Sequence, residues 1–167
     1  MKLFGRNGGD GGEADPAEAY AGLRRLALSL TAESLGAGAP SNAPAIALLM
    51  DTGMAKAVAT LVGVADGTTS LYYSSGGGVI GAGARHDVAA ATHRWLQTAG
   101  ELLGQFSPIA DAPLPAEGMA QFVAVTRGGL LGAVAPAAEL AERLHPLSPL
   151  FYAAHGVITQ IRLTQAA

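Results

Sequence analysis

The sequence predicts an α+β domain in which a central antiparallel sheet of about five strands carries helices on both faces. Residues 56–105 contain a strand–turn–strand–helix pattern, and residues 119–163 contain a second one. An amphipathic helix is expected before both, at 15–35. The expected order is therefore one helix, three strands, one helix, two strands and two further helices. A chain of 167 residues suits one such domain, spanning 15–167, behind a short tail.

The N-terminal region divides into a tail, a helix and a linker. Residues 1–14 are rich in glycine and have little to bury, so we expect this tail to be disordered. Asp15 is placed to cap the following helix, and Pro16 suits its first position. Gly and Pro residues at 36–44 predict a linker to the sheet and its packing helices, which occupy 45–167.

The first repeated unit supplies most of the expected sheet. Ala45–Met50 is short and apolar, which favours a buried strand. Ala57–Ala65 follows as a central strand with small and branched residues on both faces. Asp66-Gly67 indicates a tight hairpin turn, because glycine accepts a positive φ. Thr68–Ser75 then alternates in polarity, as a return strand with two different faces does.

The second half is expected to contain one long helix and then a repeat of hairpin and helix. Asp87 can cap a helix over 87–106, whose apolar side is centred on Trp95. The other expected elements are a loop at 107–118, strands at 121–126 and 130–135, and helices at 137–144 and from Ser148 to about 163.

Composition indicates a domain that associates with itself. Charged residues make up 14% of the chain, against a usual value of about 25%, and the mean hydropathy is +0.31. A subunit with so few charges has difficulty covering its surface with polar groups, so we expect a homo-oligomer, most simply a dimer. The ten Lys and Arg residues are scattered, and the net charge is −3. Because phosphate binding needs clustered positive charge, we expect no nucleic-acid partner.

Sequence features also bound the location of the protein. The chain has no cysteine, and therefore neither a disulfide nor a thiolate. Its first residues lack the apolar run of a secretion signal. No stretch approaches the apolar length of a membrane span. We therefore expect a cytoplasmic protein with no membrane association.

A glycine-rich segment, Gly76-Gly77-Gly78-Val79-Ile80-Gly81, matches the G-x-G-x-x-G pattern of dinucleotide-binding folds. In those folds the pattern opens a helix whose N-terminus binds pyrophosphate. Here the expected helix starts only at Asp87, whose charge would repel a phosphate. We therefore expect an uncharged edge strand that pairs with another protein chain. The residues expected at this interface are Leu71, Tyr72, Tyr73, Gly76, Gly77, Gly78, Val79 and Ile80.

The alternative for this segment is a ligand site in a small-molecule-binding protein or an enzyme. Arg85 and His86 lie shortly after residues 76–83, and in this alternative both converge with Asp51 and the glycine-rich segment on one pocket. Metal binding is not indicated, because His86 and His93 are seven residues apart, too far to share one ion without other ligands. We expect neither a metal nor a cofactor.

The tripeptide Asp51-Thr52-Gly53 resembles the signature of the retroviral-type aspartic proteases. In that family two such aspartates meet in a homodimer and act as acid and base on a water molecule. The resemblance implies Asp51 as the catalytic residue, Gly76–Gly83 as a flap, and Leu130-Leu131-Gly132 as a later apolar element. Those proteases are nearly all β, whereas several helices are expected here, and Asp-Thr-Gly also commonly forms a turn. Hydrolysis by Asp51 is therefore a remote alternative.

The order of the expected elements over residues 45–164 resembles that of roadblock (dynein light chain) and profilin-like domains. The stretches Asp66–Arg85 and His145–Leu163 also resemble an uncharacterised bacterial family. Roadblock-type domains mostly act as dimeric adaptors, so the resemblance implies a role in scaffolding or regulating another protein. The sequence therefore favours a cytoplasmic, non-enzymatic homodimer with an unknown protein partner.

Overall fold

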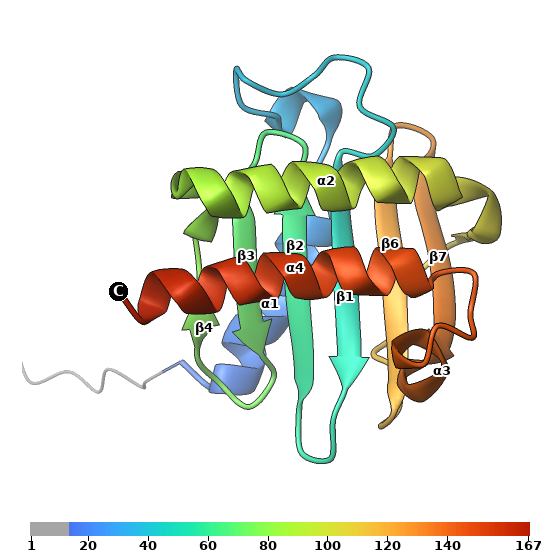
Figure 1. Cartoon of the computed structure of the whole chain (residues 1–167). Helices are drawn as coiled ribbons and strands as arrows, with labels where there is room; N and C mark the ends of the chain where they lie inside the picture. Colours follow the sequence, from blue (N-terminus) through green and yellow to red (C-terminus); the bar gives the residue numbers. More distant parts are fainter. Residues whose placement is uncertain (1–13) are drawn as a thin grey trace, which may run out of the picture.

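The computed structural model describes residues 14–167, so the predicted tail lies outside the described residues apart from Ala14. Within this range the strands form one seven-stranded antiparallel sheet in the order β4-β3-β2-β1-β6-β7-β5 (Figure 1). The strands are β1 (Ala47–Gly53), β2 (Val58–Val64), β3 (Thr69–Tyr73), β4 (Gly78–Val79), β5 (Ser107–Ile109), β6 (Met119–Thr126) and β7 (Gly129–Pro136).

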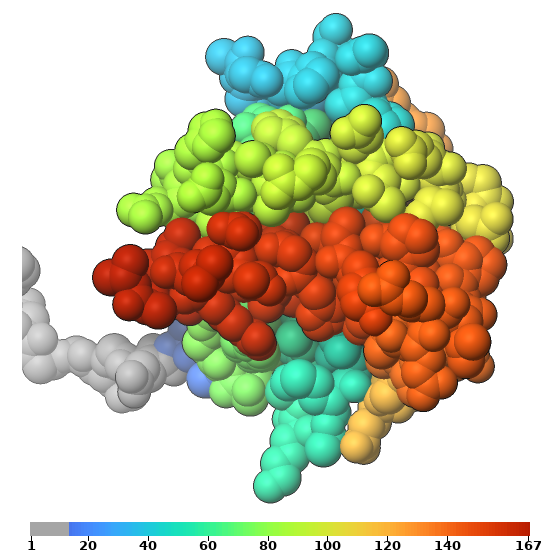
Figure 2. Space-filling view, in the orientation of Figure 1, coloured from blue at the N-terminus to red at the C-terminus, as the bar shows by residue number. Residues whose placement is uncertain are grey.

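Helices cover both faces of this sheet. α2 (His86–Leu102) and α4 (Ser148–Gln165) lie side by side across one face, and α1 (Pro16–Leu28) lies on the other (Figure 1). The short α3 (Ala137–Ala141) follows β7 and leads into α4. In Figure 2 the side chains of α2 and α4 form a continuous layer, beyond which the hairpin between β1 and β2 protrudes. The sheet is therefore the middle of three layers.

Alternation of side chains along each strand gives the sheet a separate core on each face. Among the buried side chains between the sheet and the layer of α2 and α4 are Leu48, Leu61, Trp95, Phe122 and Leu150. The core beneath α1 includes Tyr20, Leu49, Val62, Tyr72 and Val123. β1 contributes to both cores because it lies in the middle of the sheet between β2 and β6.

The predicted class, α+β with an antiparallel sheet, is confirmed, but the predicted number of strands is wrong. Residues 14–167 form seven strands, namely the five of the predicted order, the two-residue β4 in the segment expected as an edge strand, and the three-residue β5 where a loop was predicted at 107–118. β4 lies in the glycine-rich segment and β5 contains Pro108, so neither shows the alternation by which strands are recognised. Both strands lie at the edges of the sheet, on either side of the five that were predicted.

Three helices end earlier than predicted, and one of them is α2, which ends at Leu102 and passes into a 3-10 turn at Leu103–Gln105 where a helix was predicted to continue to 106. α1 ends at Leu28 and does not continue to position 35, because the Thr31 amide donates to Ser34 Oγ at 3.1 Å and starts a separate 3-10 turn. α3 ends at Ala141, and the chain then leaves the helical path at Arg143, whose φ is 62°. Hydrogen bonds made by serine and threonine side chains compete with helix continuation, which is why apolar spacing overestimated the first helix.

The contact between α2 and the sheet depends on a glycine. A Cβ at Gly63 of β2 would lie 2.8 Å from Thr92 Cγ2 and 3.1 Å from ring carbons of Trp95. Trp95 is wholly buried, and its Nε1 finds no hydrogen-bond partner among residues 14–167. The indole therefore stabilises the fold by packing, in a space that exists because position 63 has no side chain.

We expect Trp95→Ala to lower the free energy of unfolding by about 3–5 kcal/mol, because it leaves a cavity between α2 and the sheet. Trp95→Phe, which keeps a ring in the same place, is the control and should lose less. Urea unfolding followed by circular dichroism is the appropriate measurement, since Trp95 is the one tryptophan of the chain and its fluorescence is lost. An unchanged unfolding midpoint for Trp95→Ala would contradict the packing role.

Candidate functional site

A buried carboxylate lies in the middle of the sheet. The first strand continues past the predicted end at Met50 to Gly53, so Asp51 lies within β1 and not in a turn. Asp51 is opposite Thr60 on β2 and opposite Gln121 on β6, and its exposed fraction is 0%. Its side chain is on the face that α1 covers, together with the core beneath that helix.

Arg24 of α1 neutralises this carboxylate through two hydrogen bonds. Its Nη2 donates to Asp51 Oδ2 at 2.6 Å, and its Nε donates to Oδ1 at 3.2 Å. Thr60 Oγ1 donates to Oδ1 at 2.6 Å, and Gln121 Nε2 approaches Oδ2 at 3.4 Å. Both carboxylate oxygens are therefore engaged by protein donors.

A tyrosine pair extends this arrangement toward β3. Because Thr60 gives its hydroxyl hydrogen to Asp51, Tyr20 must donate to Thr60 Oγ1, at 2.7 Å. The ring of Tyr20 meets that of Tyr72 edge to face, with centroids 5.7 Å apart. We call Tyr20, Arg24, Asp51, Thr60 and Gln121 the polar cluster.

The pKa shifts of these residues agree with a polar cluster that is buried away from solvent. Burial raises the pKa of Tyr20 and of Tyr72 above the usual value, so both remain neutral hydroxyls. Burial, the largest single effect, would lower the pKa of Arg24, but its hydrogen bonds to Asp51 and its attraction to that carboxylate together raise it. Arg24 and Asp51 thus form an ion pair that holds α1 on the sheet.

The geometry argues against hydrolysis by Asp51. A catalytic aspartate of the protease type must reach a water molecule and share a proton with a second carboxylate. Asp51 has no exposed surface, and its charge is balanced by Arg24 within the same chain. The segment compared with a flap, Gly76–Gly83, holds the short strand β4 and the start of a 3-10 turn. Asp51 therefore has a structural role.

The glycine-rich segment forms a turn and the edge strand β4. Gly76, Gly77, Gly78 and Gly81 all take positive φ, which explains the glycines without a ligand. A hollow of about 380 Å³ lies beside the segment, between it and the beginning of α1. Its lining is Pro16, Ala19, Tyr20, Leu23, Tyr72, Tyr73, Gly76, Gly77, Gly78 and Ile80.

The predicted residues around this segment do not form one site. The described lining of the hollow includes neither Arg85, His86 nor Asp51. The side chains of His86 and Asp87 are 95% and 81% exposed at the start of α2. Leu71 and Tyr72 are buried in the two cores of their own subunit, so the exposed part of the predicted interface is at Gly77–Gly78 and Ile80.

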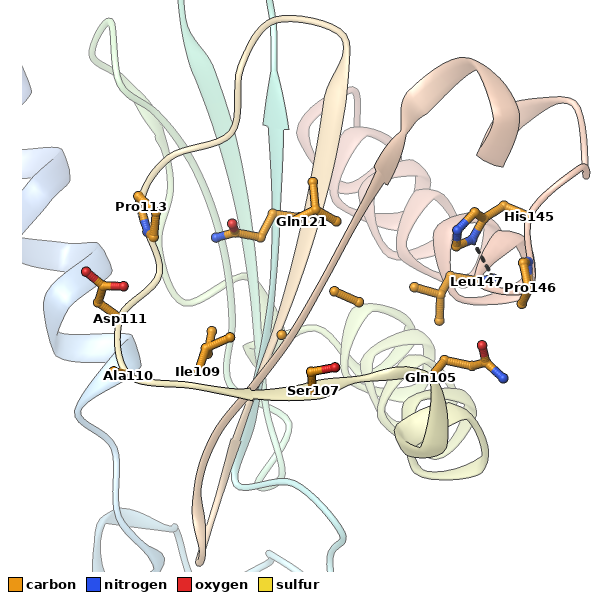
Figure 3. Close-up of a pocket in the computed structure, with 13 residues that line it drawn as sticks. Gln105, Ser107, Ile109, Ala110, Asp111, Pro113, Gln121, His145, Pro146 and Leu147 are labelled. Carbon is orange, nitrogen blue, oxygen red and sulfur yellow. Dashed lines mark hydrogen bonds between the residues drawn. The ribbon is translucent and has the colours of Figure 1, made fainter.

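A polar cavity of about 610 Å³ lies at the opposite edge of the sheet (Figure 3). It lies along β5 and beside the part of β7 that continues past Gly132, the partner of the first residue of β5, Ser107. Polar side chains from three parts of the chain line it, namely Gln105, Ser107, Asp111, Gln121 and His145. Its other lining residues are Ile109, Ala110, Pro113, Gly132, Ala133, Val134, Pro146 and Leu147.

Two of the polar residues are held in place by other hydrogen bonds. His145 Nδ1 accepts the Leu147 amide at 3.1 Å, the bond drawn in Figure 3, so a neutral His145 carries its proton on Nε2. Gln121 is 6% exposed and connects the cavity wall to the polar cluster through Asp51. The cavity therefore has a fixed hydrogen-bonding wall.

This cavity was not predicted from the sequence, because its residues come from a loop, a strand and a helix connection. One local signal was available. Gln121 interrupts an otherwise apolar strand, and Arg24 interrupts the apolar face of a helix. Polar residues in such positions require partners inside the fold.

Residues 14–167 contain neither a metal-binding cluster nor a helix that could cross a membrane. No group of three or more His, Asp or Glu residues in that range is arranged to hold a metal ion. No helix there combines the length and apolarity that crossing a bilayer requires. Comparison with family models, curated proteins and solved structures finds no match to the chain.

We expect Asp51→Asn to lower the free energy of unfolding by about 3 kcal/mol, because it leaves the Arg24 charge without a partner. Arg24→Met should also destabilise the chain, since it leaves the buried carboxylate unpaired.

The double variant Arg24→Met/Asp51→Asn keeps an amide for Thr60 and Gln121 and buries no charge. In urea unfolding, its loss of unfolding free energy should be smaller than the sum of the losses of the two single variants. Additive losses would show that the ion pair does not hold α1 on the sheet.

Proposed function

We propose that this protein is a non-enzymatic domain that forms a homodimer through the β4 edge and scaffolds or regulates another protein. The observation that carries the proposal is the unprotected edge of the sheet. Among residues 14–167, β4 pairs with one strand, β3, and its other side has no strand beside it. No charged residue occurs between Gly67 and Ala84, and the Ile80 side chain beside β4 is 68% exposed.

Exposed sheet edges normally carry features that prevent pairing with another chain. Lysine, proline and inward-pointing charges are the usual ones, and a short strand is another. Of these β4 has only its shortness, two residues. A second copy approaching about a two-fold axis would place two β4 strands antiparallel and two Ile80 side chains near each other. The low content of charged residues, 14%, supports burial of surface in this way.

The order of elements supports the adaptor role by analogy alone. Two hairpin–helix units within one antiparallel sheet resemble roadblock and profilin-like domains, whose dimers mostly act by binding other proteins. A cytoplasmic location accords with that role. Fold-level analogy identifies no partner, so the partner class must be derived from a surface of this chain.

We expect Ile80→Lys to convert a dimer into a monomer of 16.7 kDa in light scattering after size exclusion, because it introduces a charge at the proposed seam. Ile80 is preferred to Val79 because Val79 packs partly against the subunit core, so Val79→Lys would also disturb folding.

Leu163→Lys is the matched control, since Leu163 is an apolar residue of α4 that is 58% exposed. It should leave the mass unchanged. A wild-type chain that is monomeric at micromolar concentration, or an Ile80→Lys chain that remains dimeric, would contradict the proposed interface.

A further inference from the structure

We propose that the cavity at the β7 edge binds an extended, basic peptide segment of the partner protein, which lies beside β7 as an added strand. The inference rests on the proposed function in one respect, that the partner is a protein. It concerns the edge opposite to β4, so the two surfaces are physically separate.

The backbone of β7 is only partly paired on this side. β5 covers Leu130, Leu131 and Gly132, whereas β7 continues to Pro136. Within residues 14–167 no strand lies beside 133–136 on the outer side. Amide and carbonyl groups of an edge strand are a template for a further strand, which supplies the missing hydrogen bonds.

The cavity has a wall on each face of this open edge. In Figure 3 Gln121 and Ile109 lie on one side of the β7 ribbon, and His145 and Leu147 lie on the other. Ile109 packs against the core beneath α1, whereas Leu147 belongs to the core beneath α2 and α4. Successive side chains of an extended peptide point to opposite faces, so each wall would contact alternate residues of the segment.

The charge of the lining selects a basic segment. Asp111 is the only carboxylate among the described lining residues, which include no lysine or arginine. Asp111 forms no ion pair with any of residues 14–167, and its exposed side chain lies on the Gln121 side of the cavity, in the loop that follows β5 (Figure 3). A Lys or Arg of the incoming segment would be its counter-ion. Such a pair contributes more to selectivity than to affinity, and it is sensitive to salt.

Gln121 provides an acceptor in the wall of the cavity on the side of α1. Its Nε2 approaches Asp51, while no donor within residues 14–167 bonds to its Oε1. Because β7 lies between β6 and the incoming strand, this oxygen can accept a hydrogen bond from a side chain of the peptide and not from its main-chain amides. Through Asp51 and Arg24, this contact would also reach α1.

The test is an NMR titration of the ¹⁵N-labelled full chain with the peptide Val-Lys-Val-Lys-Val, blocked at both ends. We expect saturable shifts of the amides at 133–135 and of the Gln121 side-chain NH₂. The peptide Val-Glu-Val-Glu-Val and a backbone N-methylated Val-Lys peptide should both fail to produce these shifts.

Asp111→Asn should weaken binding of the Val-Lys peptide by about threefold, in keeping with an exposed ion pair. Asp87→Asn, at an exposed carboxylate on α2, is the matched control and should bind as the wild type does. Equal binding of the Glu and N-methylated peptides, or shifts absent from 133–135, would overturn the proposal. Lysine amide alone producing the same shifts would also overturn it, in favour of a small cationic ligand.

Peptide binding at the β7 edge is expected whether or not the chain forms a dimer through β4. Ile80→Lys should bind the peptide with the wild-type affinity, because that substitution lies at the other edge of the sheet. Localised peptide binding by a monomeric wild-type chain would refute the proposed dimer and leave the peptide site standing. A wild-type dimer that does not bind the peptide would refute the peptide site and leave the proposed dimer standing.

Discussion

The hydrogen-bonded ion pair between Arg24 and Asp51 is the interaction on which the arrangement of the layers depends. It joins α1, the only helix that covers its face of the sheet among residues 14–167, to the central strand β1. A buried charge pair of this kind contributes little net stability compared with apolar residues, but loss of either partner is costly. Its geometry therefore favours a single position of α1, because a shifted helix would leave the carboxylate of Asp51 without its cation.

The same cluster connects the two edges at which interactions are proposed. Strand register places Gln121, Asp51, Thr60 and Tyr72 opposite one another in succession, from β6 to β3. Gln121 contributes to the cavity at the β7 edge, and Tyr72 contributes to the hollow beside β4. A polar row under α1 thus has one end near each edge. Packed elements with few alternative arrangements transmit small displacements, so the position of α1 is common to both surfaces.

Much of the fold was predictable from local patterns, whereas the site was not. The turn at Asp66-Gly67 and the alternation in Thr68–Ser75 predicted β2, β3 and their antiparallel pairing correctly, since both signals lie within a few residues of one another. The spacing of apolar residues around Trp95 likewise predicted α2. The local pattern Asp51-Thr52-Gly53 predicts a turn or, by resemblance, a catalytic acid, and not a residue in the middle of a strand. Its partners Arg24 and Gln121 are 27 and 70 residues away, and no local pattern indicates such pairings.

What the sequence determined by itself was therefore the set of strongly periodic elements and the presence of an uncharged segment between Gly67 and Ala84. Only the tertiary structure decided which two residues of the glycine-rich segment form β4, and that three residues of the predicted loop at 107–118 form β5 at the other edge of the sheet. It also decided that a loop, a strand and a helix connection enclose one cavity. The physical reason is that short edge strands and cavity walls have little structure of their own. They acquire it from hydrogen bonds and packing with segments that are distant in the chain.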